Sequence, residues 1–231
     1  AEPVLVHRAQ ALCYAWIYLD DHGLEEIDVQ MTYAHLDTEM IKRFRETMTR
    51  EELESWYQRL LDSYHKWLSY QMKWREERNR SMEKLEFPFT YRKGQKEMVA
   101  GIYHAISRKE QIFIQAPTGV GKTMSAVFPA VRSIGEGKAE TLFYLTARTI
   151  TRTVAQDAFE ILRKNGLLFK TVTITAKEKL CFCEKPECNP ETCPYAKGHY
   201  DRINDAVYEL WTNEQSFDRE TILRQAEKWQ V

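Results

Sequence analysis

A run of eight residues near the middle of the chain could hold the phosphates of a nucleotide. It follows the phosphate-loop pattern G-x-x-x-x-G-K-[ST], with alanine in place of the first glycine. In such a loop, backbone N–H groups and the start of the next helix bind phosphate oxygens, the lysine reaches the β- and γ-phosphates, and the threonine hydroxyl binds Mg²⁺. We therefore predict a nucleotide site with Lys122 and Thr123 as catalytic residues; an ordinary turn with a chance match is the alternative. The binding residues are Ala116, Pro117, Thr118, Gly119, Val120, Gly121, Lys122 and Thr123.

Four of the five cysteines lie close together and could bind a metal centre. They are Cys181, Cys183, Cys188 and Cys193. In a chain without a secretion signal, four neighbouring thiols favour a metal over disulfides. Zinc sites usually contain two C-x₂₋₄-C pairs, so the C-x-C start is awkward for zinc, whereas irregular spacing and a final Cys-Pro suit a [4Fe–4S] cluster. The pattern favours the cluster and leaves zinc as the alternative.

The composition is that of an ordinary globular protein. Hydrophobic residues make up 43% and charged residues 29%, and the formal net charge is −1, so any nucleic-acid-binding surface must be local. No apolar run is long enough to span a membrane, and no signal peptide is present. We therefore expect a cytoplasmic protein without a membrane partner. Because the sequence begins without Met and enters a helical pattern at once, we expect a piece of a larger protein.

The elements around the phosphate loop predict an α/β fold. The apolar runs Ile112–Ile114, Thr141–Thr146 and Thr171–Thr175 read as strands, with helices expected at 124–132 and 154–163. A strand, a helix and a second strand in this order form a right-handed parallel β-α-β unit, the core of a doubly wound sheet. We therefore predict a parallel sheet flanked by helices that positions the loop.

The residues around this loop resemble those of superfamily 2 helicases. Phe87-Pro88-Phe89 ends one helical pattern and Gln95 begins another, shortly before the phosphate loop. In these helicases a glutamine so placed contacts the adenine edge, so the resemblance implies ATP as the nucleotide. Thr146, Arg148 and Thr149 follow the second predicted strand and resemble the motif that holds the backbone of single-stranded DNA. A surface loop with helix-capping threonines is the alternative for these three.

The phosphate loop and the cysteines together resemble the XPD/DinG family of superfamily 2 iron–sulfur DNA helicases. The resemblance extends from Phe87 to Val231 and includes the segment Cys193–Arg202 after the last cysteine. It implies a partial RecA-like motor domain with a helical, cysteine-rich insertion that contains a [4Fe–4S] cluster. It also implies ATP- and Mg²⁺-dependent translocation on single-stranded or forked DNA and duplex unwinding in DNA repair or replication. The C-x-C start departs from the family's wider spacing and leaves the role of Cys183 open.

The first residues suggest a different unit. His7–Leu19 is strongly apolar at helical spacing, and Asp28–Ala34 alternates as a half-buried strand. The pair Gln10 and Tyr14 resembles the Q-x-x-x-Y helix of RecB-like nucleases of the PD-(D/E)XK class, which would make this region the remnant of a nuclease domain. A plain core helix explains the same residues equally well.

A long helical segment is expected between the two regions. Thr49 to Glu52 fits a capping box, and apolar and aromatic residues then recur at steps of three and four as far as Leu85. The predicted organisation is a nuclease-like remnant at 1–36, a helical connector at 37–86, a partial helicase domain at 87–176 and a cluster domain at 177–231.

One helicase feature is missing. No acidic D-E-A-H-like motif follows a strand after Thr123, so we expect these 231 residues alone to hydrolyse ATP very slowly. Two other functions remain open: a zinc-stabilised nucleic-acid-binding module with a vestigial phosphate loop, and an NTPase whose cysteine loop senses redox state.

Overall fold

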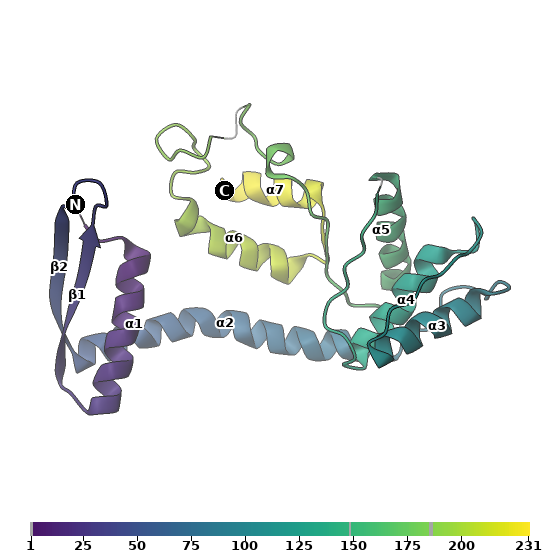
Figure 1. Ribbon diagram of the computed structural model, residues 1–231, viewed down its shortest axis with the longest axis horizontal. Coiled ribbons are helices and arrows are strands. Elements are labelled where there is room, and N and C mark those ends of the chain that lie inside the picture. The colour runs from purple at the N-terminus through teal and green to yellow at the C-terminus, as the bar shows by residue number, and fades with distance from the viewer. Residues whose placement is uncertain (1, 148, 185–186) are drawn as a thin grey trace. The chain divides into compact units, whose positions relative to one another are not determined.

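The computed structural model describes residues 2–147, 149–184 and 187–231, without the side chains of residues 149–151. The chain divides into two compact units, Ala1–Ser69 and Tyr70–Val231. The long helix α2, Arg50–Glu83, begins in the first unit and ends in the second (Figure 1). No helix in the described ranges is long and apolar enough to cross a membrane.

The first unit is a helix packed on a β-hairpin. Helix α1 spans Leu5–His22, and strands β1, Glu26–Ala34, and β2, Ile41–Thr49, pair antiparallel from Glu26↔Thr49 to Ala34↔Ile41. Alternate residues of the strands point to opposite faces, so one face of the hairpin packs against α1 and the start of α2. The buried residues are Leu12, Ala15, Leu19, Val29 and Leu53.

The start of α2 confirms one prediction and corrects another. The Thr49 hydroxyl accepts from the Glu52 N–H at 3.3 Å and Glu52 accepts from the Thr49 N–H at 3.0 Å, which is the predicted capping box. Helical character from residue 37 onward is wrong over Ile41–Thr49, because this stretch forms β2. Its charged residues individually favour helix, but Phe44 and Met48 alternate on the inner face and the whole stretch pairs with β1.

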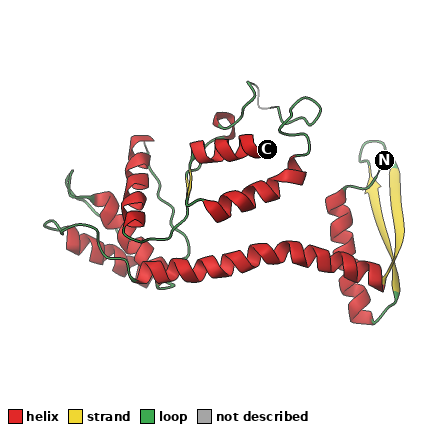
Figure 2. Cartoon of the chain, turned by 180° about the vertical axis from the view of Figure 1, so that it is seen from behind, coloured by secondary structure: helices red, strands yellow, loops and turns green. Residues whose placement is uncertain are grey.

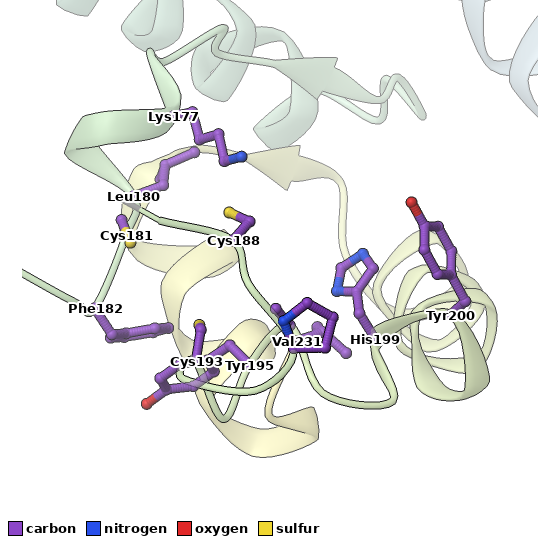
Figure 3. Close-up of a pocket in the computed structure, with 12 residues that line it drawn as sticks. Lys177, Leu180, Cys181, Phe182, Cys188, Cys193, Tyr195, His199, Tyr200 and Val231 are labelled. Carbon is purple, nitrogen blue, oxygen red and sulfur yellow. The ribbon is translucent and has the colours of Figure 1, made fainter. Parts of the chain in front are cut away.

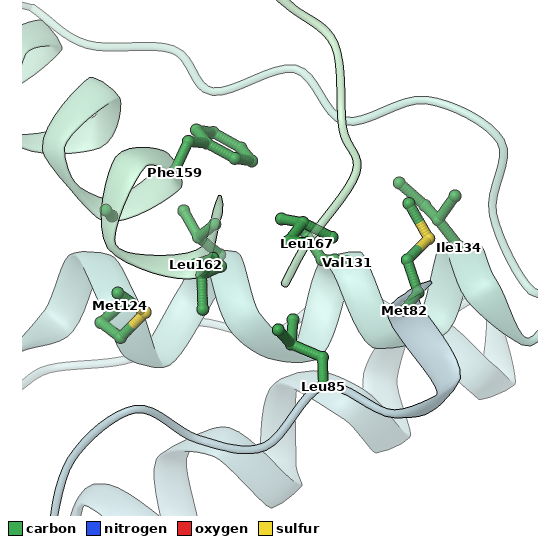
Figure 4. Packing of buried hydrophobic residues seen from close by; sticks show 10 residues of the cluster. Met82, Leu85, Met124, Val131, Ile134, Phe159, Leu162 and Leu167 are labelled. Atoms are coloured by element: carbon green, nitrogen blue, oxygen red, sulfur yellow. The ribbon is translucent and has the colours of Figure 1, made fainter. Parts of the chain in front are cut away.

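The second unit is mostly helical (Figure 2). Its helices after α2 are α3, Gln95–Arg108; α4, Lys122–Gly135; α5, Thr149–Lys164; a 3₁₀ turn, Lys177–Lys179; α6, His199–Asn213; and α7, Arg219–Trp229. These agree with the helices predicted after Gln95 and after the phosphate loop. The core joins the end of α2 to α4 and α5 (Figure 4) and contains Met82, Leu85, Met124, Val127, Val131, Ile134, Ala158, Phe159, Leu162 and Leu167.

Helices α2 and α4 approach each other closely at Gly135, the last residue of α4. A Cβ atom placed on Gly135 would lie 2.5 Å from the Cβ of Met82, a distance that real side chains do not adopt. The absence of a side chain at Gly135 therefore lets the two helix ends touch.

The predicted parallel sheet through the three apolar runs is not formed. Among the described residues, Ile112–Ile114 and Thr141–Thr146 belong to no strand, and only β3, Thr171–Val172, pairs in parallel, with β4, Ser216–Phe217. Phe113 and Leu145 are 95% and 88% exposed. A buried parallel strand needs a neighbour on each edge and cover on both faces, and here these segments have neither. The fold is thus mixed α/β, mostly helical, with two small sheets.

Candidate functional site

The phosphate loop leads directly into α4. Gly119 and Gly121 have φ of +82° and +76°, a left-handed backbone in which other residues are strained. Gly121 is the N-cap residue of α4 and forms no side-chain cap. The first N–H groups of a helix lack intrahelical partners and attract anions, and α4 presents such groups directly after the loop. Phosphate binding by this loop stays a prediction.

Lys122 and Thr123 lie at this helix start, as the sequence predicts. The ammonium of Lys122 donates to the carbonyl oxygen of Ala116 at 3.0 Å, so the lysine folds back across the loop. The Thr123 hydroxyl accepts from the hydroxyl of Tyr144 at 3.4 Å. The sequence analysis did not single out Tyr144, because a tyrosine within an apolar run reads as part of a buried strand.

Gln95 is bound to the loop rather than open to solvent. It is only 5% exposed, its side-chain N–H donates to the carbonyl of Val120 at 3.1 Å, and its oxygen accepts from the Arg92 N–H at 3.0 Å. The Arg92 guanidinium donates to the carbonyl of Gly119. The turn before α3 thus holds the phosphate loop at two successive carbonyls. A primary amide has two N–H donors and two acceptor positions, so Gln95 keeps one of each for a further partner.

The structure describes only some of the three residues that are predicted to contact DNA. Thr146 is exposed, and Thr149 is the first residue of α5. Arg148 and the side chain of Thr149 lie outside the described residues. The contact of these three with DNA therefore stays a prediction.

In the first unit, Gln10 and Tyr14 lie on the exposed face of α1. The amide of Gln10 donates to the Tyr14 hydroxyl at 3.5 Å. This contact follows from their spacing of one helical turn, so the nuclease resemblance remains one of sequence.

The four clustered cysteines lie around one loop system between the 3₁₀ turn and α6. Cys181, Cys188 and Cys193 line a cavity of about 380 Å³ (Figure 3), and the sulfurs of Cys183 and Cys193 are 3.9 Å apart. No group of three or more His, Cys, Asp or Glu side chains among the described residues is arranged as metal ligands. The loops therefore bring the thiols into one neighbourhood without placing them in coordination geometry.

Hydrogen bonds shift the pKa values of Cys193 and Cys183 in opposite directions. Backbone N–H groups, first that of Ala196, point at the Cys193 sulfur and lower its pKa, whereas the contact with Cys193 raises the pKa of Cys183. Lys177 bonds the Cys188 sulfur, which raises the pKa of the lysine. Cys193 is therefore the thiol best prepared to carry negative charge as a ligand.

The spacing of the sulfurs can be compared with both metal centres. Two thiolates on one tetrahedral zinc, with Zn–S bonds of about 2.3 Å, stand about 3.8 Å apart, which is close to the separation of Cys183 and Cys193. Thiolates on different irons of a [4Fe–4S] cluster stand farther apart. The neighbouring cavity, which Cys181, Cys188 and Cys193 line, measures about 380 Å³. The four-thiol donor set fits either centre, and the 3.9 Å pair fits a shared ion better.

A lysine that the sequence analysis did not single out fixes the helix after the cysteine loops. Lys170 donates to the carbonyls of Trp211 and Glu214, the latter at 2.6 Å, and its ammonium lies 4.3 Å from the ring centre of Trp74. Partial burial lowers the pKa of Lys170 to about 8. A cation at a helix C-terminus stabilises the terminal carbonyls, so Lys170 holds the end of α6 against α2.

Residues 92–189 match the family model of the DEAD/DEAH box helicase. The matched range begins at Arg92, contains the phosphate loop and ends just after Cys188. No curated protein and no solved structure matches the chain. The chain therefore contains a DEAD/DEAH box helicase domain over residues 92–189, a kind of domain that acts on nucleic acid and typically uses ATP and Mg²⁺.

Proposed function

We propose that this chain is part of an ATP-dependent DNA helicase of the XPD/DinG type, which couples ATP hydrolysis to movement along single-stranded or forked DNA in repair or replication. The observation that carries the proposal is the phosphate loop, held at the N-terminus of α4 and fastened to Gln95 within the matched helicase domain. The DNA substrate and the pathway rest on the resemblance of the sequence.

The residues of the loop have distinct roles in this proposal. Backbone N–H groups at the start of α4 bind the phosphates, and Lys122 exchanges its bond to Ala116 for one to the β- and γ-phosphates. Thr123, whose hydroxyl now accepts from Tyr144, would hold Mg²⁺ through that oxygen. Gln95 keeps the loop in shape and offers its remaining donor and acceptor to adenine. Thr146, Arg148 and Thr149 hold DNA phosphates through hydroxyl and guanidinium groups.

We propose further that Cys181, Cys183, Cys188 and Cys193 hold a [4Fe–4S] cluster. The irregular spacing, the terminal Cys-Pro and the cavity of about 380 Å³ support it. The cluster would supply a rigid, redox-active centre for the loops. The N–H groups of Ala196 and Tyr195 would stabilise the Cys193 thiolate, and Lys177 would place a positive charge beside Cys188.

A second function is favoured by one specific observation. The 3.9 Å separation of Cys183 and Cys193 suits a single zinc ion. The chain would then be a zinc-stabilised nucleic-acid-binding module whose phosphate loop, with Ala116 in place of glycine, is vestigial.

Nucleotide binding tests the first proposal. Titration of the chain with a fluorescent ATP analogue and Mg²⁺ should show saturable binding with slow turnover, because the acidic motif is missing from these residues. Lys122→Ala removes a charged hydrogen bond worth about 1.5–3 kcal/mol, so the affinity should fall about ten- to hundredfold. Lys164→Ala, an exposed lysine at the end of α5, is the matched control and should bind normally. Equal binding by the two variants would reject the proposed site, and rapid DNA-stimulated hydrolysis would reject the expectation of slow turnover.

Elemental analysis separates the two metal centres. Chain purified under nitrogen should contain iron and acid-labile sulfide and absorb broadly in the visible, as thiolate-bound iron does. A colourless chain with one zinc would reject the iron–sulfur cluster and identify zinc as the metal; the rival function also requires that the chain fail to bind ATP. Loss of the metal in Cys188→Ser, with retention in Cys13→Ser, assigns whichever centre is found to these loops.

A further inference from the structure

Two of the four clustered thiols are already adjacent in the absence of any metal. The sulfur of Cys183 lies 3.9 Å from that of Cys193, although the residues are ten apart in sequence. Cys188, by contrast, has a lysine as a partner, since its sulfur is bonded by Lys177. Cys181 also lies beside Cys183, but a bridge between residues two apart closes a very small ring and strains the preferred disulfide geometry. Cys183 and Cys193 are thus the pair best placed to react with each other.

An aromatic stack holds the two cysteine loops together. The ring of Phe182, next to Cys183, stacks on that of Tyr195, two residues after Cys193, with ring centres 4.8 Å apart and planes 24° from parallel. Offset stacks of this kind add about 0.5–1.5 kcal/mol beyond the burial of area. The stack keeps the two sulfurs near each other when no ion joins them.

The two thiols differ in exposure. Cys193 is only 8% exposed, whereas Cys183 is half-buried. Exposure therefore makes Cys183 the first target of a dissolved reagent, although the contact with Cys193 raises the pKa of Cys183. Cys193, the neighbouring thiol, can then displace the reagent from the Cys183 sulfur.

We propose that Cys183 and Cys193 form a redox-active dithiol, which a low-molecular-weight disulfide such as oxidised glutathione converts to an intramolecular bridge in the metal-free chain. The Cys183 thiolate attacks one sulfur of the reagent, forms a mixed disulfide and expels one thiol. The Cys193 thiolate then attacks the Cys183 sulfur and expels the second thiol. The two cysteines lose two electrons and two protons, and the reagent becomes two thiols.

The bridge excludes the metal centre. It removes two of the four thiolates on which either proposed centre depends, so oxidation and metal binding compete for the same sulfurs. The inference does not depend on which metal is bound or on helicase activity, and nucleotide binding by Lys122 is tested separately.

The test uses the full chain, freed of metal by a chelator and reductant under nitrogen and then treated with oxidised glutathione. The intact mass should fall by about 2 Da, the mass of two thiol hydrogens. Digestion after glutamate separates three of the relevant cysteine segments, at Glu184, Glu187 and Glu191. The expected product links the fragment Lys179–Glu184 to the fragment Thr192–Glu209. A bridge to the fragment that contains Cys188, a persistent glutathione adduct or a bridge between two chains would each overturn the proposal.

Variants assign the reacting sulfurs. Cys193→Ser should stop at the glutathione adduct on Cys183, whereas Cys181→Ser and Cys188→Ser should still lose about 2 Da. Phe182→Ala should slow the second step several-fold, and an unchanged rate would remove the role of the stack. Because Lys179–Glu184 contains both Cys181 and Cys183, the fragment map excludes Cys188, and sequencing of the linked fragments by tandem mass spectrometry decides between the other two even if a variant fails to fold. A bridge from Cys181 to Cys193 would overturn the proposal.

Zinc uptake tests the competition. The reduced chain should bind added zinc, the oxidised chain should not, and a reductant should restore binding. Equal zinc binding by both forms would show that the bridge and the metal do not share sulfurs.

Discussion

Gln95 engages both polar atoms of its side chain with the backbone. It binds the Val120 carbonyl of the phosphate loop and the Arg92 N–H of its own turn, and a Cβ on Gly121 would lie 2.7 Å from its nitrogen. The amide therefore shapes the loop before any nucleotide arrives. Recognition of adenine, which the resemblance implies, would use only the one N–H donor and the one acceptor position that the Gln95 amide has left.

Replacing Gln95 separates these two roles. Gln95→Ala leaves a loop carbonyl and an N–H without partners, at a cost of about 1–3 kcal/mol, so nucleotide affinity should fall roughly tenfold. If the glutamine only shapes the loop, ATP and GTP lose affinity equally. If it also reads the base, the preference for ATP over GTP disappears. Gln71→Ala, an exposed glutamine on α2, is the control.

At this scale the sequence predicted the residues that lie within one motif. Lys122 and Thr123 lie at the start of α4 because the motif runs directly into that helix, whereas Gln95 was singled out by the helicase resemblance, and its role toward adenine stays a prediction. Tyr144 and Lys170 were not singled out, because their partners Thr123 and Trp74 lie 21 and 96 positions away and only the fold brings them near. Nothing in the sequence indicated that the sulfur of Cys183 lies 3.9 Å from that of Cys193.

Among the elements, helices with strong apolar periodicity were predicted well, whereas the strands were predicted only in part: Asp28–Ala34 lies within β1, and only the start of Thr171–Thr175 forms β3. Helices α1, α3, α4 and α5 match stretches in which the sequence predicts a helical pattern. Strand β2 was missed because its pairing with β1, and not its own composition, makes it a strand. The runs at 112–114 and 141–146 have strand-like composition, but a ladder needs partners, and the described residues supply none there.

The contact between α2 and α4 gives a prediction for one element pair. Gly135→Ala would place a Cβ 2.5 Å from that of Met82 and force the helix ends apart. We expect the second unit to lose about 1–3 kcal/mol of unfolding free energy, the usual cost of overpacking, in urea denaturation followed by circular dichroism.

Gly101→Ala is the matched control. Gly101 lies within α3, where a new Cβ would meet only the flexible tip of Ile112, at 3.3 Å. Alanine is favoured over glycine in a helix by about 1 kcal/mol, so this variant should be as stable as the parent or more so. A Gly135→Ala variant as stable as Gly101→Ala would contradict the tight α2–α4 approach.

For the molecule as a whole, the lowered pKa of Lys170 leads to a prediction of how the free energy of unfolding depends on pH. Its pKa is lowered from 10.5 to about 8 because burial disfavours the charge, while Glu214 opposes and Arg163 reinforces the shift. Between these two values the unfolded chain binds the proton and the folded chain does not, so this lysine makes folding more favourable as pH rises from about 8 to about 10.5. Below pH 8 its contribution is constant.

The measurement compares the parent with Lys170→Met across this range. Thiols and tyrosines such as Tyr70, whose pKa is raised mainly by burial, titrate here too, so only the difference between the two proteins reports on the lysine. The free energy of unfolding of the parent minus that of the variant should increase as pH rises from about 8 to about 10.5. A constant difference between pH 8 and 10 would mean that the lysine is not perturbed by burial.

The uncovered side chains Phe113, Phe143 and Leu145 have a practical consequence for all of these measurements. Large apolar surfaces that meet water directly promote self-association as protein concentration rises. Binding isotherms and unfolding curves should therefore be repeated at several dilutions, with light scattering as a monitor. Charged substitutions at Phe113 and Leu145 should delay the onset of scattering and leave the phosphate loop and the cysteine loops free for study.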